Sequence, residues 1–568
     1  MPVKLRGEIK MKKYMRKLIV LAFMLVISVV VTGCGADNQL AGTDAQPLPT
    51  PAEGAPSAGQ PGAEVTEGGR YGGVVRFAWA AGPVRPNVLL RRCGPGGIVR
   101  DLHWGRLYSI AYDGSIVPSL ATGHSVSEDG LVYTMYLREG VVWHDGHPFT
   151  SADVVFFHEY APLAREASVD TFTPPPSGYR VVALDDHTVQ FILDEPNPFF
   201  AWQHQFVEYM VLPKHIWQDI DPAQWDYITD LDILGVGIGP FRLTELRMDE
   251  FARFVRFDDY WGGRPYLDEF VFQFVPDTTA RITAFEAGQL DHFINVPRTF
   301  YNSHRDNPNF SFDFLPSGHM TLVLLNHNDE RLSRLPVRQA LSFIMDRDSM
   351  RLAAEGFAAP MLSAITSSDI FYNADAADAS AFEFSIERAI EVLEADGWMP
   401  GADGIRVRDG KRLQFEILAN HTPNFEMIGV LSMDTARQAG IELNVRFVDS
   451  ALWAEQVFSL QEFDLAFNGM IMGPTPMGYR AMYTTGAMTT FVSDEVAELF
   501  ARLDNAASEE EMIGLMNEIQ YVVTRERAAI WLFEGVQGIS WTNGLNISEA
   551  GVSGMYERWN HVHRMFFE

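Results

Sequence analysis

The chain has 568 residues, of which 47% are hydrophobic, and a formal net charge of −30. This length and composition allow a large buried core and roughly two to four domains. The negative charge disfavours nucleic-acid binding, and two cysteines, Cys34 and Cys93, are too few for a disulfide-stapled scaffold.

The first residues have the pattern of an export signal. Basic residues at positions 12, 13, 16 and 17 precede an apolar run over 18–31, which is short for a transmembrane helix. The run ends at Val31-Thr32-Gly33-Cys34, which matches a bacterial lipobox. We therefore predict a lipoprotein signal peptide over 1–34, with Cys34 as the lipidated residue; the alternative is a plain signal peptide with a chance cysteine.

Residues 35–69 predict a tether. They are rich in Ala, Gly, Pro and acidic residues and contain almost no large apolar side chains. Such a segment cannot bury a core and is expected to be disordered. A lipid and a tether would keep a globular body beside a membrane.

The globular part contains strand and helix patterns. Alternation over 73–79 predicts a strand, and alternation over 131–137 predicts a hairpin that turns at Glu139-Gly140 into 141–143. Thr150 and Asp153 predict a helix start, and 336–345 and 385–396 are amphipathic. Further on, strands alternate with helices, and this order predicts an α/β lobe: strand 413–418, helix 425–438, strand 443–448, helix 451–460 and strand 463–467.

A loop predicted after Phe467 is the first candidate for a binding site. Residues 468–479 are apolar, glycine-rich and uncharged. In open α/β sheets, ligands bind outside the carboxyl ends of strands, so this loop could line a binding cleft. The alternative is a structural crossover packed against a neighbouring lobe.

Motifs for catalysis are missing from the sequence. It contains no GxSxG elbow, Walker A loop or HExxH helix, and Gly235 to Pro240 fits a turn into a strand over 241–246 better than a dinucleotide fingerprint. His144-Asp145-Gly146-His147 is the best metal candidate, although Asp-Gly is also a common turn pair, and surface histidines at a turn are the simpler interpretation. We predict no catalytic residue, resident metal or cofactor.

A long series of motifs gives the sequence a family resemblance. Residues 107–121, 127–130, 137–141 and 144–154 contain the spacings LY, P-LA, S-DG, LR-GV and DG-P-TA-DV. Further matching blocks follow at 237–241, 259–268, 287–291, 337–347 and 393–398, with Ile238 as a departure. From Tyr71 to the end, the chain resembles the family-5 bacterial extracellular solute-binding proteins, the dipeptide and oligopeptide receptors of ABC importers.

The resemblance implies an α/β, two-lobed periplasmic-binding-protein type II (Venus flytrap) fold with an extra small domain in the first lobe. Lobe I would consist of 70–112, 232–325 and 536–568, with the extra subdomain at 113–231 and lobe II at 326–535. The His144 turn would lie in that subdomain, away from the cleft.

The implied function is capture of a small, peptide-like solute by hinge closure and its delivery to an ABC permease with its ATPase subunits. The protein would be a monomer without enzymatic activity, anchored by lipid to the outer face of the cell membrane.

The sequence departs from the family in the predicted cleft loop. Peptide-binding members often carry an aspartate in a GW-AD pattern, whereas here Met470 replaces the Trp and Gly473 the Asp. Because a buried ammonium needs a counter-charge, either another carboxylate serves or the ligand has no free amino terminus. The expected ligand-binding residues, each of which could instead be a core residue, are Trp79, Asn87, Tyr372, Trp453, Asn468, Met470, Met472 and Tyr479.

Three alternatives to a peptide importer receptor stay open. The solute could be an oligosaccharide or a metal complex. The scaffold could carry a secreted hydrolase, or the chain could be a signalling receptor without its own transporter.

Overall fold

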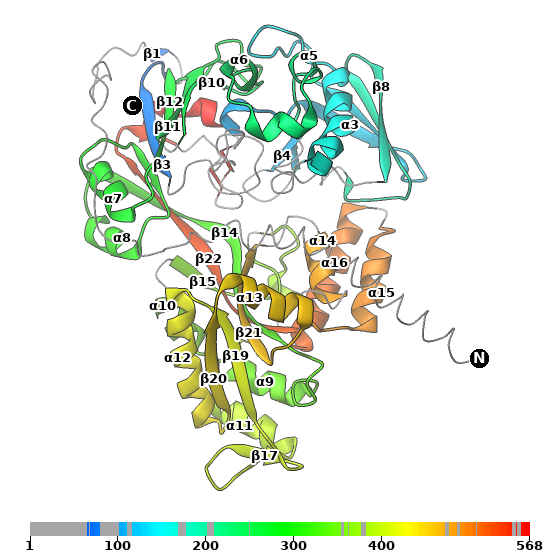
Figure 1. Ribbon diagram of the computed structural model, residues 1–568, viewed down its shortest axis with the longest axis vertical. Helices are drawn as coiled ribbons and strands as arrows, with labels where there is room; N and C mark the ends of the chain where they lie inside the picture. The colour runs from blue at the N-terminus through cyan, green and yellow to red at the C-terminus, as the bar shows by residue number, and fades with distance from the viewer. Residues whose placement is uncertain are drawn as a thin grey trace. The chain divides into compact units, whose positions relative to one another are not determined.

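The computed structural model describes most of the chain from Val65 onward (Figure 1). The described residues are 65–66, 69–79, 101–110, 116–167, 178–200, 210–248, 250–353, 357–361, 363–367, 369–376, 382–471, 476–484, 489–506, 508–547, 552–553, 558–559 and 561–568. They divide into two compact units. The central unit is Gly318–Val536, and the split unit comprises the described residues up to Ser317 together with Gln537–Glu568.

Two long strands belong to both units. β14 (Phe310–Leu325) passes from the split unit into the central unit, and β22 (Ala529–Thr542) passes back. The two strands are neighbours in the strand order of one eleven-stranded sheet (Figure 1).

In the central unit, the strand order continues from β14 through β21 and β19 to β20, and β15 pairs with β22. The strands are β15 (Phe357–Pro360), β19 (Gln414–Asn420), β20 (Glu442–Val448) and β21 (Leu465–Ile471). β19 is parallel to both β20 and β21, whereas β14 runs antiparallel to β21.

The helices of the central unit include α12, which packs against β19 and β20 (Figure 1). They are α9 (Leu335–Phe343), α10 (Arg347–Ala353), η3 (Ala374–Ala376), α11 (Ile386–Ala395), α12 (Pro423–Gln438), α13 (Ser450–Ala454), η5 (Glu455–Leu460), α14 (Pro476–Tyr483), α15 (Asp494–Leu503) and α16 (Glu509–Arg525). A small sheet adds β16 (Met399–Pro400), β17 (Arg406–Arg408) and β18 (Lys411–Arg412).

In the split unit, the main sheet has the order β10-β11-β12-β3-β13-β22. Its strands are β3 (Val74–Trp79), β10 (Phe241–Arg247), β11 (Phe251–Arg256), β12 (Glu269–Phe274) and β13 (His292–Ile294). Within it, β3 is parallel to β12 and β13.

A separate antiparallel sheet of the split unit has the order β6-β7-β9-β8. Its strands are β6 (Ala121–Val126), β7 (Val132–Leu137), β8 (Tyr179–Asp185) and β9 (Thr188–Leu193), and α3 (Ser151–Ala167) contacts β8 and β9.

The remaining elements of the split unit are short helices and strand pairs. They are β1 (Val65–Thr66), β2 (Gly69–Arg70), β4 (Tyr108–Ile110), β5 (Ile116–Pro118), α5 (Lys214–Trp217), η2 (Pro222–Tyr227), α6 (Leu231–Leu234), α7 (Thr278–Glu286), α8 (Arg298–His304), β23 (Leu545–Asn546), β24 (Val552–Ser553), β25 (Arg558–Trp559), η7 (Val562–Arg564) and β26 (Phe566–Phe567).

The alternation of strands and helices predicted from 413 onward is confirmed within a few residues for β19, α12, β20 and β21. The predicted helices at 336–345 and 385–396 are α9 and α11, and Ser385 caps α11 by accepting the N–H of Arg388 at 3.2 Å. The helix predicted over 451–460 is α13 followed by the wider π turn of η5.

Two local predictions are wrong. The strand at 131–137 does not turn back into 141–143: β7 pairs with β6 and β9, and Val142 bridges only Pro148. The loop predicted from Asn468 begins later, because β14 extends the pairing of β21 as far as Ile471. Gly469 is needed there, since a Cβ would lie 2.9 Å from the His319 ring.

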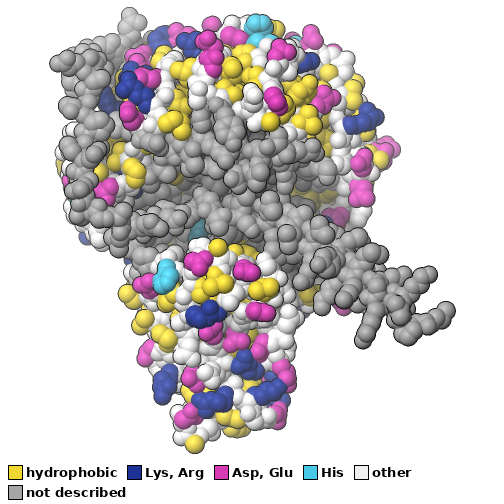
Figure 2. Space-filling model, in the orientation of Figure 1, with side chains coloured by type: hydrophobic (Ala, Val, Ile, Leu, Met, Phe, Trp, Pro, Cys, Tyr) yellow, Lys and Arg dark blue, Asp and Glu magenta, His cyan; other side chains and the backbone are white. Residues whose placement is uncertain are grey.

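The described surface of the central unit mixes charges of both signs. Figure 2 shows acidic and basic side chains interspersed around α11 and β17. Arg408 pairs there with Asp396 at 2.7 Å, and Arg412 pairs with Asp403 at 2.8 Å. Over the described part of the chain, none of the helices combines the length and the apolar composition that crossing a bilayer requires.

Candidate functional site

The parallel strands of the central unit define an edge where ligands would be expected. β19, β20 and β21 run in the same direction, so their carboxyl ends lie at one edge of the sheet. In open α/β sheets this is the edge at which ligands bind. Asn468 and Met470 lie in β21, opposite Leu322 and Met320 of β14, and α13 follows the carboxyl end of β20.

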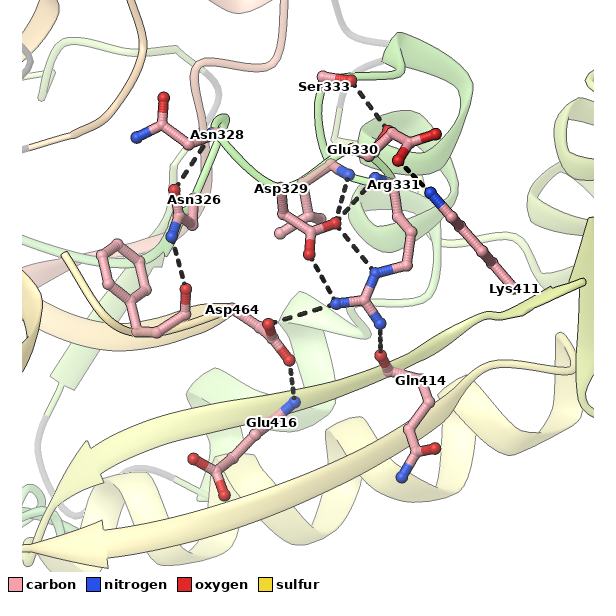
Figure 3. A network of polar contacts seen from close by, with 12 residues as sticks. Asn326, Asn328, Asp329, Glu330, Arg331, Ser333, Lys411, Gln414, Glu416 and Asp464 are labelled. Carbon is pink, nitrogen blue, oxygen red and sulfur yellow. Dashed lines mark hydrogen bonds and ion pairs between the residues drawn. The ribbon is translucent and has the colours of Figure 1, made fainter. Parts of the chain in front are cut away.

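The opposite edge is closed by a polar network (Figure 3). The Arg331 guanidinium donates to both carboxylate oxygens of Asp329, at 2.9 and 2.7 Å, and to Asp464 at 3.3 Å. It also donates to the carbonyl of Gln414, the first residue of β19. Asp464 in turn accepts the backbone N–H of Glu416 at 3.0 Å.

Asn326 ties the same edge to the turn before β21. Its amide donates to the carbonyls of Gln461 and Phe463, at 3.2 and 2.7 Å. A hollow of about 710 Å³ lies beside this network and is lined by its charged side chains. Because these groups join the amino ends of β19 and β21 to the end of β14, we interpret this edge as a structural clamp.

Two sequence-predicted residues of the central unit carry buried donors without partners among the described residues. The side chains of Asn468 and Trp453 are each 3% exposed. Neither Asn468 Nδ2 nor Trp453 Nε1 has a hydrogen-bond partner among the described residues. A buried donor without a partner is costly, so these two N–H groups are available to a bound acceptor.

A buried carboxylate joins two other sequence-predicted residues. Asp369 accepts the Tyr479 hydroxyl at 2.9 Å and the backbone N–H of Phe371 at 2.9 Å, while its carbonyl accepts the N–H of Tyr372 at 3.0 Å. Tyr479 is fully buried. Burial raises the pKa of Asp369 to about 6, against an ordinary value of 3.8.

A second buried carboxylate, that of Glu534, contacts Ser367, which lies two positions before Asp369 in the chain. It is 6% exposed on β22 and accepts the Ser367 backbone N–H at 2.7 Å and the Ser367 hydroxyl. Burial raises its pKa, and both burial and the charge of Glu534 raise the pKa of Tyr372. Ser367 itself is exposed, so Glu534 lies just beneath the surface.

The structure thus gathers Tyr372 and Tyr479 around Asp369 and places Asn468 and Met470 on β21. Met470 is 5% exposed and packs as a core side chain. Trp79 belongs to the split unit, where it ends β3, is 8% exposed and stacks on Phe77. Asn87, Met472 and Cys34 lie outside the described residues.

Sequence reasoning did not single out Asp369 or Glu534. Glu534 directly follows the apolar run from Ala528 to Phe533, and a charge that interrupts a buried strand is a usable signal. Asp369 follows two serines in a segment without periodicity, and nothing in that pattern indicates burial.

His144 and His147 of the split unit do not form the metal site that the sequence motif offered. His144 is directed inward: its Nδ1 accepts the N–H of Gly237 at 3.0 Å, and its Nε2 lies 2.8 Å from the carbonyl oxygen of Gly239. Burial lowers the pKa of His144 to about 4. His144 is therefore a structural residue that fixes the turn before β10.

The sequence profile of the bacterial extracellular solute-binding proteins, family 5 (middle region), matches residues 115–490. The oligopeptide-binding protein AppA of Bacillus subtilis is 27% identical over 361 residues, 62% of this chain and 65% of AppA, so the match spans just under two thirds of that relative. The dipeptide-binding protein of Escherichia coli is 27% identical over 303 residues, 50% of this chain and 56% of the relative.

Solved structures share the fold. The substrate-binding protein CtaP of Listeria monocytogenes superimposes with a TM-score of 0.73 at 20% identity, over 88% of this chain and 99% of CtaP. AppA of Bacillus subtilis in complex with a nonapeptide gives a TM-score of 0.67 at 21% identity, over 88% of this chain and 100% of AppA. These likenesses confirm the two-lobed type II fold predicted from the sequence. With more than half of its length matched by the profile, this chain belongs to family 5 of the bacterial extracellular solute-binding proteins.

Proposed function

We propose that this chain is the extracytoplasmic substrate-binding component of an ABC importer, which captures a peptide-like solute and delivers it to a membrane permease. The observation that carries the proposal is the family match over residues 115–490, together with relatives named for oligopeptide and dipeptide binding. The domain division expected from the sequence, with an extra subdomain at 113–231, is part of this proposal.

In the central unit, Asn468 and Trp453 would supply hydrogen bonds to the solute. Each carries a buried N–H donor without a partner among the described residues, and peptide carbonyl oxygens are suitable acceptors. A peptide backbone presents such acceptors whatever its side chains are, so this contact suits a receptor with broad specificity. Tyr372, which is partly exposed, would border the same surface, while the buried Met470 and Tyr479 and the residues Trp79, Asn87 and Met472 stay proposals without a further argument.

Glu534 is our candidate for the missing counter-charge. The family aspartate is replaced by Gly473, and a buried ammonium requires a carboxylate. Glu534 lies just beneath exposed Ser367, whereas Asp369 is covered by the fully buried Tyr479. A ligand ammonium beside Glu534 would favour its ionised form and release the proton that burial helps it retain.

Isothermal titration calorimetry with short peptides and their N-acetylated forms tests the proposal. We expect Glu534→Gln, whose amide oxygen can still accept the Ser367 N–H, to weaken binding of free peptides by about 10- to 100-fold, because a charged hydrogen bond contributes about 1.5–3 kcal/mol. The N-acetylated peptides should bind wild type and variant alike. Glu416→Gln, at the clamped edge of the sheet, is the matched control and should change nothing.

Asn468→Leu separates binding from stability. The variant removes a buried donor that lacks a partner, so its thermal stability without ligand should be unchanged or higher, while its peptide affinity should fall. A loss of stability with unchanged affinity would contradict the role given to Asn468.

Oligosaccharides and a nickel–histidine complex should be tested as ligands beside the peptides. A fold neighbour, NikZ of Campylobacter jejuni, was solved with Ni(L-His). If one of these binds and no peptide does, the solute assigned to the protein changes, but its role as a receptor stands. Stabilisation by none of them, or cleavage of a labelled peptide by the purified protein, would overturn the receptor role.

We further propose that Cys34 carries a lipid that holds the protein at the outer face of the membrane, with residues 35–69 as a tether. Labelled palmitate should enter the wild-type protein in cells, whereas Cys34→Ser should remain unlabelled and appear in the medium or the periplasm. Labelling of the variant would contradict this assignment.

A further inference from the structure

Three metal-ligating side chains meet at the surface of the split unit. Asp145 and His147 come from the turn before α3, and His215 comes from α5. His215 Nε2 lies 2.7 Å and His147 Nδ1 3.4 Å from the same oxygen, Asp145 Oδ2. The two imidazole rings stack with their centroids 3.9 Å apart. Among the residues that the structure describes, this is the only group of three such side chains whose ligand atoms all lie within 4.8 Å of one another.

A buried carboxylate holds the two segments in place. Asp153, which is 4% exposed, accepts the backbone N–H of Thr150 and of Lys214, both at 2.9 Å, and the Trp143 indole N–H at 3.3 Å. It therefore ties the turn at 143–150 to the start of α5. These bonds hold the two segments that carry the ligating residues next to each other.

The turn itself directs the ligands. Gly146 has φ +87°, a conformation that favours glycine, and donates its N–H to the carbonyl of Trp143 at 2.8 Å. Asp145 Oδ1 accepts the N–H of His147 at 3.2 Å, and this contact leaves Oδ2 directed at the two histidines. The tight turn thus separates the buried His144 from the exposed His147.

The donor set indicates the class of ion. Two imidazole nitrogens and one carboxylate oxygen suit zinc, copper and nickel, whereas calcium and magnesium prefer sites made of oxygen alone. Three protein ligands leave a position open for water. The side chains of His147, His215 and Asp145 are 59%, 25% and 29% exposed, so an ion can reach them from solvent. The net charge of −30 also favours the approach of cations.

We infer that Asp145, His147 and His215 bind one divalent transition-metal ion of the zinc class, which cross-links the turn to α5. Bound there, the ion bridges two segments about 70 residues apart in the sequence. None of its residues is among the proposed solute-binding residues, and none lies in the central unit that carries Asn468 and Glu534.

Metal binding by the full chain, produced without a histidine tag and stripped of metal, tests the inference. Native mass spectrometry and calorimetry with Zn²⁺ should show one tight site per chain. His147→Ala and His215→Ala should each weaken it at least about tenfold. His421→Ala is the matched control: His421 is also exposed and lies 3.6 Å from a carboxylate, that of Glu426, but it belongs to no cluster of three ligands within the described part of the chain.

Copper provides a second readout that needs no variant. Electron paramagnetic resonance of the wild type with one equivalent of Cu²⁺ should show coupling to two imidazole nitrogens. Coupling to fewer than two, or Zn²⁺ binding that is equally strong in wild type, His147→Ala and His215→Ala, would overturn the inference. Loss of Zn²⁺ binding in His421→Ala alone would do the same.

Discussion

Replacing Asp369 by Asn should stabilise the protein at neutral pH. Asp369 is buried, and its partners are the Tyr479 hydroxyl and the Phe371 N–H, so it faces no cation among the contacts described. Burial raises its pKa to about 6 from an ordinary 3.8. The folded chain therefore keeps this proton up to a higher pH than the unfolded chain does.

The sign and size follow from linkage. Between these two pKa values the folded state binds more protons than the unfolded state, so its stability falls as pH rises from 3.8 to about 6. Above that window the full cost is present, and the difference corresponds to about 3 kcal/mol. Asn keeps an oxygen acceptor and an amide in the same volume but carries no charge. We expect Asp369→Asn to gain up to about 3 kcal/mol at pH 8 and almost nothing below pH 4.

Differential scanning calorimetry of wild type and variant at pH 4, 6 and 8 measures this gain. For a unit of this size, each kcal/mol corresponds to about 2–4 °C in Tm. Asp375→Asn, at an exposed position six residues further on, is the control and should not shift Tm at any of the three pH values. If Asp369→Asn lowers Tm at pH 8 as much as at pH 4, the carboxylate is an ionised structural acceptor and the reasoning fails.

Three further perturbations address the scaffold. Arg331→Ala should cost about 1.5–3 kcal/mol in urea unfolding, because it removes charged hydrogen bonds to the partly buried Asp329 and Asp464. Arg331→Lys should cost less, and equal costs would contradict the two-pronged contact of the guanidinium. His292 is buried with a pKa lowered to about 3, so stability should fall as pH drops below 6.5, and His292→Phe should reduce that fall in calorimetry; an unchanged pH profile would count against it. Gly237→Ala should lower Tm strongly, since its Cβ would lie 2.0 Å from the His103 carbonyl oxygen, whereas Gly123→Ala meets no atom within 4 Å and should lower Tm little; similar shifts would contradict the steric argument.

The sequence predicted the parts of the fold that rest on local periodicity. The amphipathic spacing of α9 and α11 and the alternation of β19, α12, β20 and β21 need only their own residues to be recognised. The failed hairpin at 131–143 shows the limit. β7 pairs with β9, more than fifty residues further on, and local alternation says nothing about the partner of a strand.

The candidate site depends on contacts that no local pattern contains. The position of Asn468 after a predicted strand made it a candidate, and Trp453 was named without such an argument. Only the structure shows that the N–H groups of both are buried and lack partners among the described residues. Glu534 reaches Ser367 across 167 positions of the chain, and Asp369 reaches Tyr479 across 110.

In the histidine turn, the tertiary structure separates two residues that the sequence motif places together. The motif offered His144 and His147 as a pair, yet backbone contacts of the segment before β10 draw His144 into the core. The partner that His147 gains instead is His215, which Asp153 brings to the turn through the N–H of Lys214. A ligand set is thus decided by which side of a turn each residue faces and by what packs against it. For this reason the cluster of Asp145, His147 and His215 can be recognised only from the tertiary structure, and no sequence motif joins the three residues.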